Sequence, residues 1–184
     1  MARAGRGREP QAEMDAERVL DLLSHLEACG IAVWLDGGWA IDALLGKQTR
    51  PHDDLDLVSR LEDSARIEQA LGERGYVLAG GGAPQSFELV DDQGHQVDVH
   101  PASFRADGDG VYAMEDGGEW IFPAAGFGGS GGLVLGRRVP CLTPEVVMVN
   151  HTTGYALDGE HQRDVRALGE RYGIPVPPFR RRLS

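Results

Sequence analysis

Apolar residues near the start of the chain follow a helical spacing and then give way to a short continuous run. Four of them share one helix face: Val19, Leu22, Leu23 and Leu26. Asp15 is suited to cap this helix and Gly30 to end it. The apolar run 31–35 that follows predicts a buried strand.

The same patterns predict the remaining elements. Strands are expected at 55–58, 76–78, 87–90 and 96–99, and helices at 39–45, at 62–74, from Thr143 onward and at about 160–171. Pro101 is expected to end the strand that contains 96–99. Short strands broken by glycine are expected over 111–138.

A glycine-rich segment, Gly126-Phe127-Gly128-Gly129-Ser130-Gly131, satisfies the dinucleotide pattern G-x-G-x-x-G. A dinucleotide-binding turn must open a helix, whereas the apolar residues 133–135 that follow favour a strand. The dinucleotide interpretation is therefore rejected. A flexible hairpin tip is favoured over a substrate lid.

Length and composition indicate one core, since the chain has 184 residues with 41% hydrophobic content. We expect a flexible tail over 1–14, one domain over 15–178 with a helical C-terminal part from about 143, and a basic tail over 179–184. No apolar run is long enough to span a bilayer, so a cytoplasmic protein without a membrane partner is expected. The two cysteines, Cys29 and Cys141, have no spacing that suggests zinc, and reduced structural thiols are expected.

The net charge of -11 argues against a nucleic-acid partner, because binding to phosphate backbones depends mainly on clustered Lys and Arg. An acidic protein suits a cationic small substrate instead. This is weak evidence, since acidic surfaces also serve solubility alone.

Carboxylates alternate with apolar residues in two predicted strands. Asp54 and Asp56 flank a leucine, so both point to one side, and Asp98 and His100 likewise share one exposed face. Three converging carboxylates are the ligands that Mg²⁺ needs to hold a nucleoside triphosphate. The alternative is that the three are ordinary strand-edge carboxylates.

A double glycine, Gly37-Gly38, lies between the strand 31–35 and the helix 39–45. Gly38 would let a backbone amide approach phosphate oxygens, and the helix N-terminus adds partial positive charge. Two side chains that follow have two interpretations each. Arg50 either contacts the triphosphate or is a solvated loop residue, and His52 either contacts phosphate or caps the loop.

The runs 34–46 and 49–57, with Val97-Asp98-Val99-His100-Pro101, resemble the antibiotic nucleotidyltransferases of the DNA polymerase β superfamily. They are most similar to the small lincosamide nucleotidyltransferases, with aminoglycoside-modifying enzymes as relatives. A weaker likeness extends through 136–155 and 164–168, so the resemblance covers roughly 15–178.

The resemblance implies an α+β fold, a mixed sheet backed by helices. It also implies transfer of a nucleoside monophosphate from Mg²⁺-bound ATP, or another triphosphate, to a hydroxyl of a small antibiotic. Asp54 and Asp56 would bind Mg²⁺, Asp98 would join them or act as general base, and the Gly37-Gly38 turn would hold phosphate. One departure is the lack of a lysine in the C-terminal helix, where Arg163 is the nearest substitute.

Residues for the acceptor are less well defined. Glu88 is the reserve base, and Glu88, His100 and Tyr155 are the candidate acceptor contacts. Trp120, Phe122 and Phe127 offer further apolar contact, although such aromatics usually belong to the core. A lincosamide is favoured over an aminoglycoside. The alternatives are AMP transfer to a protein, as in small antitoxin-type enzymes, and a non-catalytic nucleotide-binding protein; a site shared across a homodimer is also kept open.

Overall fold

The computed structural model describes residues 12–153 and 159–177. Its helices are α1 (Ala16–Ala28), α2 (Gly37–Leu45), α3 (Ser64–Gly72), α4 (Pro144–Thr152) and α5 (Gly159–Tyr172), with 3₁₀ turns η1 (Leu61–Asp63) and η2 (Ala124–Phe127). Its strands are β1 (Val33–Leu35), β2 (Asp54–Arg60), β3 (Val77–Gly81), β4 (Phe87–Val90), β5 (Gln96–Phe104), β6 (Gly110–Ala113), β7 (Glu119–Phe122), β8 (Gly132–Val134) and β9 (Arg137–Val139). Among the described residues, no helix combines the length and the apolar character needed to cross a membrane.

The predicted capping residues do define the helix ends. Asp15 caps α1 by accepting a hydrogen bond from the Arg18 amide at 2.8 Å. Gly46 ends α2 with a left-handed φ of 74°, which glycine adopts at little cost. Thr143 lies at the start of α4, followed by proline in the first turn. Two helices differ from the prediction at their ends, because α2 already begins at Gly37 and α3 covers Ser64–Gly72 instead of 62–74.

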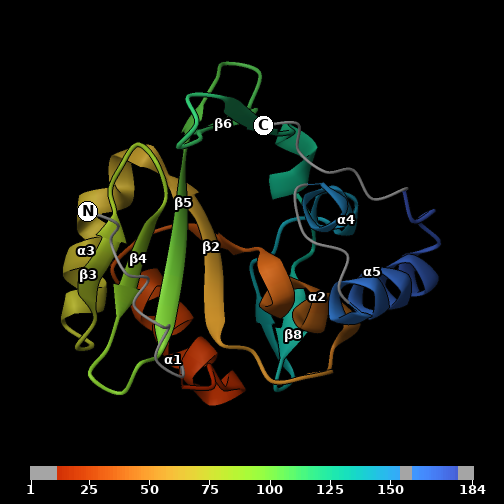
Figure 1. Ribbon diagram of the computed structural model, residues 1–184, viewed down its shortest axis with the longest axis horizontal. Helices are drawn as coiled ribbons and strands as arrows, with labels where there is room; N and C mark the ends of the chain where they lie inside the picture. Colours follow the sequence, from red (N-terminus) through yellow and green to blue (C-terminus); the bar gives the residue numbers. More distant parts are fainter. Residues whose placement is uncertain (1–11, 154–158, 178–184) are drawn as a thin grey trace, which may run out of the picture.

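The main sheet has two parallel strands at its centre. Its order is β1-β2-β5-β4-β3, and β6 and β7 continue from β5. Strands β2 and β5 run parallel, whereas the other pairs of this sheet are antiparallel. Figure 1 shows β2 and β5 side by side, with α2, α4 and α5 gathered near β8 on the right. The expected mixed sheet with helices is confirmed.

Alternation along the central strands separates the core from the polar face. Leu55 and Leu57 on β2, and Val97 and Val99 on β5, are fully buried in one core with the apolar face of α1. Residues between them in the sequence must point to the opposite face of the sheet. The carboxylates of β2 and β5 therefore share that opposite face.

Strand β5 does not end at Pro101, contrary to the prediction, but continues to Phe104. On one edge of β5, strand β4 pairs only as far as Val99. Strand β6 begins its pairing with β5 at Ala102. Pro101 lies in the gap between these two neighbours, where a missing backbone N–H interrupts neither ladder.

The N-terminal tail predicted over 1–14 includes Met14, which belongs to the folded domain instead. Met14 is fully buried, and its carbonyl oxygen accepts a hydrogen bond from the Trp39 indole at 3.0 Å. The Met14 amide donates to the His52 carbonyl oxygen at 2.7 Å. An apolar side chain in the core and two hydrogen bonds thus fix this segment to the domain.

The glycine-rich segment was expected to be a hairpin tip, but this prediction is wrong. The segment connects η2 to β8. The hairpin of β8 and β9 instead turns at Leu135 and Gly136. A Cβ on Gly126 would lie 2.9 Å from a Val146 methyl group of α4. Close packing against a helix therefore explains this glycine.

Candidate functional site

Three carboxylates lie in register across three neighbouring strands. Asp56 on β2 is opposite Asp98 on β5, and Asp98 is opposite Glu88 on β4. Residues in register point to the same face of a sheet, and Asp54 joins them because it precedes Asp56 by two positions. We call Asp54, Asp56, Asp98 and Glu88 the carboxylate row. The structure thus places the three predicted metal ligands and the reserve base on one face of the sheet.

Asp98 lies among the other carboxylates of the row and is partly buried. Burial, with the neighbouring charge of Asp56, raises the pKa of the Asp98 carboxyl to about 7. The Gln96 side-chain amide opposes this effect by donating a hydrogen bond to Asp98 Oδ1 at 2.7 Å. Crowded carboxylates repel one another unless a proton or a cation lies among them. The row is therefore suited to a divalent cation.

His100 lies on the same face as the carboxylate row, two residues beyond Asp98. Its Nε2 atom is 3.3 Å from Asp56 Oδ1. Burial alone would lower the pKa of this imidazole, but the hydrogen bond and the charge of Asp56 raise it above its ordinary value. The ring packs edge-on against Tyr112 of β6, with 5.6 Å between centroids. Tyr112 was not predicted, because an isolated tyrosine in a short strand carries no functional signal.

The double glycine opens α2 directly beside the carboxylate row. Gly37 has a φ of 62°, and a Cβ there would overlap the Asp56 carboxylate. A Cβ on Gly38 would overlap the imidazole of His52. Glycine is therefore needed at both positions because neighbouring side chains approach the backbone closely. At Gly37 the left-handed backbone is a second reason.

His52 lies beneath this turn rather than in an open cleft. Only 3% of its surface is exposed, and its Nε2 atom is 2.6 Å from Asp42 Oδ2. Asp42 also accepts hydrogen bonds from the backbone amide and the hydroxyl of Thr49, at 3.0 and 2.5 Å. Of the two interpretations of His52, the geometry favours the one in which it holds the loop.

Arg50 connects the same loop to the C-terminal helix. Its Nε donates to Asp164 Oδ2 of α5 at 3.0 Å, and 23% of the arginine side chain stays exposed. A Cβ on Gly38 would lie 3.0 Å from a guanidinium nitrogen of Arg50. The guanidinium therefore stands beside the glycine turn.

The hydrogen bonds of the buried Asp36, next to the Gly37-Gly38 turn, were not predicted from the sequence. The Asp36 amide donates to the Asp56 carbonyl oxygen at 3.1 Å, and Asn150 Nδ2 of α4 donates to Asp36 Oδ2 at 2.7 Å. Burial raises the pKa of Asp36, an effect that the charge of His151 opposes. The available signal was Asp36 itself, a carboxylate between an apolar strand and two glycines.

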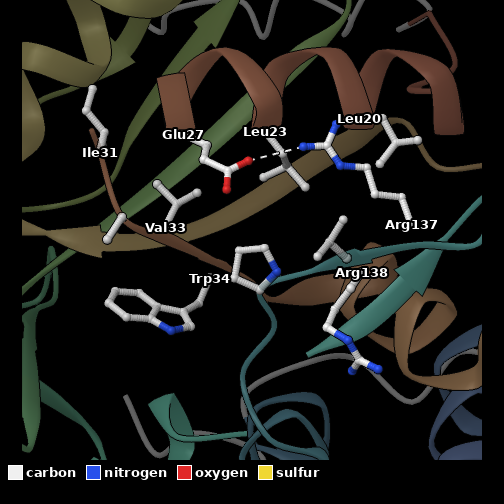
Figure 2. A pocket seen from close by; sticks show the side chains of 11 residues that line it. Leu20, Leu23, Glu27, Ile31, Val33, Trp34, Arg137 and Arg138 are labelled. Carbon is white, nitrogen blue, oxygen red and sulfur yellow. Dashed lines mark hydrogen bonds and ion pairs between the residues drawn. The ribbon is translucent and has the colours of Figure 1, made fainter. Parts of the chain in front are cut away.

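One hollow lies away from the carboxylate row. A pocket of about 230 Å³ opens between α1, β1 and β9, and in Figure 2 Arg137 pairs with Glu27 across it, at 3.1 Å. No predicted site residue within the described ranges lines this pocket. A second, shallower hollow of about 290 Å³ includes Ser86 and Tyr112, and Tyr112 joins it to His100. Tyr155, a predicted acceptor contact, lies outside the described residues.

Comparison with known proteins agrees with this geometry. The family model for aminoglycoside-2''-adenylyltransferase matches residues 18–168. The lincosamide resistance protein of Staphylococcus haemolyticus is 31% identical over 150 residues, covering 82% of this chain and 89% of the relative. A 2''-aminoglycoside nucleotidyltransferase of Klebsiella pneumoniae is 29% identical over 130 residues, covering 69% and 67%.

A solved structure gives the same result for the fold. The lincomycin-bound lincosamide antibiotic adenylyltransferase LnuA aligns with a TM-score of 0.75 and 28% identity, covering 89% of this chain and 100% of that protein. The mixed sheet is therefore the polymerase β-like nucleotidyltransferase fold that the sequence resemblance implied. The chain belongs to the aminoglycoside-2''-adenylyltransferase family of nucleotidyltransferases.

Proposed function

We propose that this protein transfers a nucleoside monophosphate from Mg-ATP, or another triphosphate, to a hydroxyl of a small antibiotic, with a lincosamide favoured and an aminoglycoside next. The observation that carries the proposal is the carboxylate row, in register across three strands and in contact with Gly37. The acceptor class is supported by two relatives, a lincosamide resistance protein and a lincomycin-bound adenylyltransferase.

Asp54, Asp56 and Asp98 are proposed to hold Mg²⁺. Their carboxylate oxygens are the hard ligands that Mg²⁺ prefers, and the pKa of Asp98, raised by burial and by the charge of Asp56, reflects the cost of a negative charge there without a cation. When bound, Mg²⁺ neutralises charge on the triphosphate and on the departing pyrophosphate. The chain has one lysine, Lys47, which is exposed after α2, so the chain's own phosphate contacts must come from elsewhere.

Asp98 is proposed to take the proton from the attacking hydroxyl. An oxygen–phosphorus bond forms at the α-phosphate, the bond to pyrophosphate breaks, and the hydroxyl proton passes to the carboxylate. In the metal-free protein, a pKa raised to about 7 makes the Asp98 carboxylate basic enough to accept a proton near neutral pH. Glu88, exposed and opposite Asp98, is the reserve base.

The triphosphate is proposed to lie against the N-terminus of α2. The first amides of this nine-residue helix, at Gly37 and Gly38, lack partners within the helix and carry partial positive charge. Arg50 is proposed to add a full charge, because its guanidinium stands beside Gly38 while Asp164 holds it. His52 is proposed to act indirectly, by supporting Gly38 from its buried position.

The acceptor is proposed to lie at the β4–β6 end of the carboxylate row. Here Glu88 is opposite Asp98, and His100 packs against Tyr112, which lines a hollow together with Ser86. An aromatic wall beside acidic groups suits a drug with an apolar part and a single positive charge. Tyr155 stays a proposal from the sequence.

We expect Gly37→Ala to lower nucleotidyl transfer about tenfold or more. Its methyl group would overlap the Asp56 carboxylate, and alanine at a left-handed φ costs about 1–2 kcal/mol. Gly46→Ala is the matched control, since Gly46 has a φ of 74° but nothing within 4 Å of a new Cβ. Initial rates at saturating ATP measure the effect. Equal losses in both variants would contradict a role for the contact with Asp56.

Lincomycin or clindamycin is expected to be modified more readily than kanamycin or tobramycin. The purified protein is incubated with Mg²⁺ and each triphosphate against both drug classes, and mass spectrometry detects the gain of one nucleoside monophosphate. Rising salt provides an independent measurement. A polycationic acceptor held by carboxylates would lose affinity steeply, whereas a largely apolar acceptor would not.

Transfer to aminoglycosides alone, with steep salt dependence, would overturn the acceptor but leave the chemistry intact. Transfer to a partner protein and to no drug would support the antitoxin-type alternative. Failure to modify any acceptor, with unimpaired triphosphate binding, would favour a non-catalytic nucleotide-binding protein.

A further inference from the structure

We infer that His25, Cys29 and Glu73 form a zinc-type metal site between the ends of α1 and α3, separate from the carboxylate row. The three side chains each offer one ligand atom, and these atoms lie within 4.8 Å of one another. The spacing of the cysteines had argued against zinc. The fold changes that conclusion by bringing Glu73 from α3 to a histidine and a cysteine on α1.

The distances within this cluster approach those of a coordination sphere. His25 Nε2 lies 3.3 Å from Glu73 Oε2 and 4.0 Å from Cys29 Sγ. Zinc–ligand bonds of tetrahedral sites place neighbouring nitrogen and oxygen ligands about 3.4 Å apart, and nitrogen and sulfur ligands about 3.6 Å apart. The nitrogen–oxygen separation already fits. The nitrogen–sulfur separation is a few tenths of an ångström longer, a difference within the range of a small side-chain rotation, and the Cys29 sulfur lies within 4.8 Å of the Glu73 carboxylate.

The backbone holds the three ligands in place. His25 lies in the last turn of α1, and Cys29, four residues later, directly follows the helix on the same face. Glu73 follows the last turn of α3, which packs beside α1. Arg66 in the first turn of α3 donates a hydrogen bond to the Cys29 carbonyl oxygen at 2.8 Å, which is a second contact between α3 and the end of α1.

The donor atoms suit a transition metal better than a proton. His25 Nε2 has three electron-rich neighbours, Glu73 Oε2, Cys29 Sγ and the Ala70 carbonyl oxygen, the last at 2.8 Å. A proton on this nitrogen can form a hydrogen bond to only one of these neighbours, whereas a metal cation can bind the nitrogen together with the other donor atoms. Thiolate and imidazole ligands select zinc or cobalt over Mg²⁺. The site would therefore not compete for the ion of the carboxylate row.

Metal binding would release one proton, from the Cys29 thiol. The Cys29 thiol releases its proton to solvent, and the His25 ring carries its remaining proton on Nδ1 so that Nε2 can bind. The fourth position falls to water or to the Ala70 carbonyl oxygen. Binding to the folded state alone would stabilise the contact between α1 and α3.

Cobalt provides the test, because a cysteine thiolate bound to Co²⁺ produces a charge-transfer absorption that carboxylate ligands do not. The full-length protein is titrated with Co²⁺ in excess Mg²⁺, and we expect one equivalent to give this band and Zn²⁺ to remove it. Cys29→Ser should abolish the band, and His25→Gln should weaken Co²⁺ binding about tenfold or more. Cys141→Ala is the matched control, because Cys141 is the chain's other cysteine and is 2% exposed.

Thermal unfolding provides the second measurement. Zn²⁺ is expected to raise the midpoint of the parent and of Cys141→Ala but not that of Cys29→Ser. A band that persists in Cys29→Ser, or its absence from the parent, would overturn the site. Nucleotidyl transfer by Cys29→Ser should match the parent without added Zn²⁺, which separates this inference from the proposed function.

Discussion

Asp56→Asn is expected to reduce nucleotidyl transfer about a thousandfold, because loss of a carboxylate proposed to bind Mg²⁺ would remove several kcal/mol of transition-state stabilisation. Asp56 is the residue that meets Gly37, Asp98 and His100 at once. Asparagine has the same shape, so no core volume is lost. Rates with ATP, Mg²⁺ and the accepted drug measure the loss, and thermal unfolding checks the fold.

Asp53→Asn is the matched control for this prediction. Asp53 precedes β2, is exposed, and is adjacent in sequence to Asp54, so its substitution makes the same chemical change outside the carboxylate row. Its rate is expected to stay close to that of the parent. Similar losses in the two variants would point to a general effect of charge, and full activity of Asp56→Asn would refute the metal assignment.

The alternation of residues explains why the main features of the site could be predicted. In β2 and β5 the side-chain period is two, so apolar neighbours of Asp54, Asp56 and Asp98 determine which face the carboxylates share. The register between the strands could not be predicted, because it depends on tertiary pairing. Only the structure places Asp56 opposite Asp98, and Asp98 opposite Glu88.

Buried polar partners were beyond the reach of the sequence. His52 was a candidate for phosphate binding, but its partner Asp42 lies within the apolar pattern of α2 and carries no local signal. Asp36 and Asn150 are 114 positions apart and meet through the packing of α4. Such pairs follow from how helices dock, which local periodicity does not encode.

The aromatic residues of the second half illustrate the same limit. Phe127 was a candidate for acceptor contact, yet its ring packs 4.8 Å from the rings of both Trp34 and Phe104. Phe122 is 3% exposed in the same core. These rings fill space between the sheet and η2. Tyr112, closer to the carboxylate row, is the aromatic residue that borders the proposed acceptor position.

Asp98→Asn is expected to keep triphosphate binding but to lose turnover about a hundredfold or more, as for removal of a general base. Calorimetric titration with ATP and Mg²⁺ measures the first quantity, and the maximal rate with drug measures the second. Glu88→Gln is the comparison, since Glu88 is opposite Asp98 but exposed. If Asp98→Asn retained full turnover while Glu88→Gln lost it, the role of base would pass to Glu88.

The same substitution should change how stability depends on pH. Without Mg²⁺, the folded state raises the pKa of Asp98 from 3.8 to about 7, so between these values the folded protein binds more protons than the unfolded chain. The parent should therefore lose stability as pH rises through this range. Asparagine does not titrate, so the unfolding midpoint of Asp98→Asn should exceed that of the parent by more at pH 8 than at pH 5. A constant difference across this range would show that burial and the neighbouring carboxylates do not raise the pKa of Asp98.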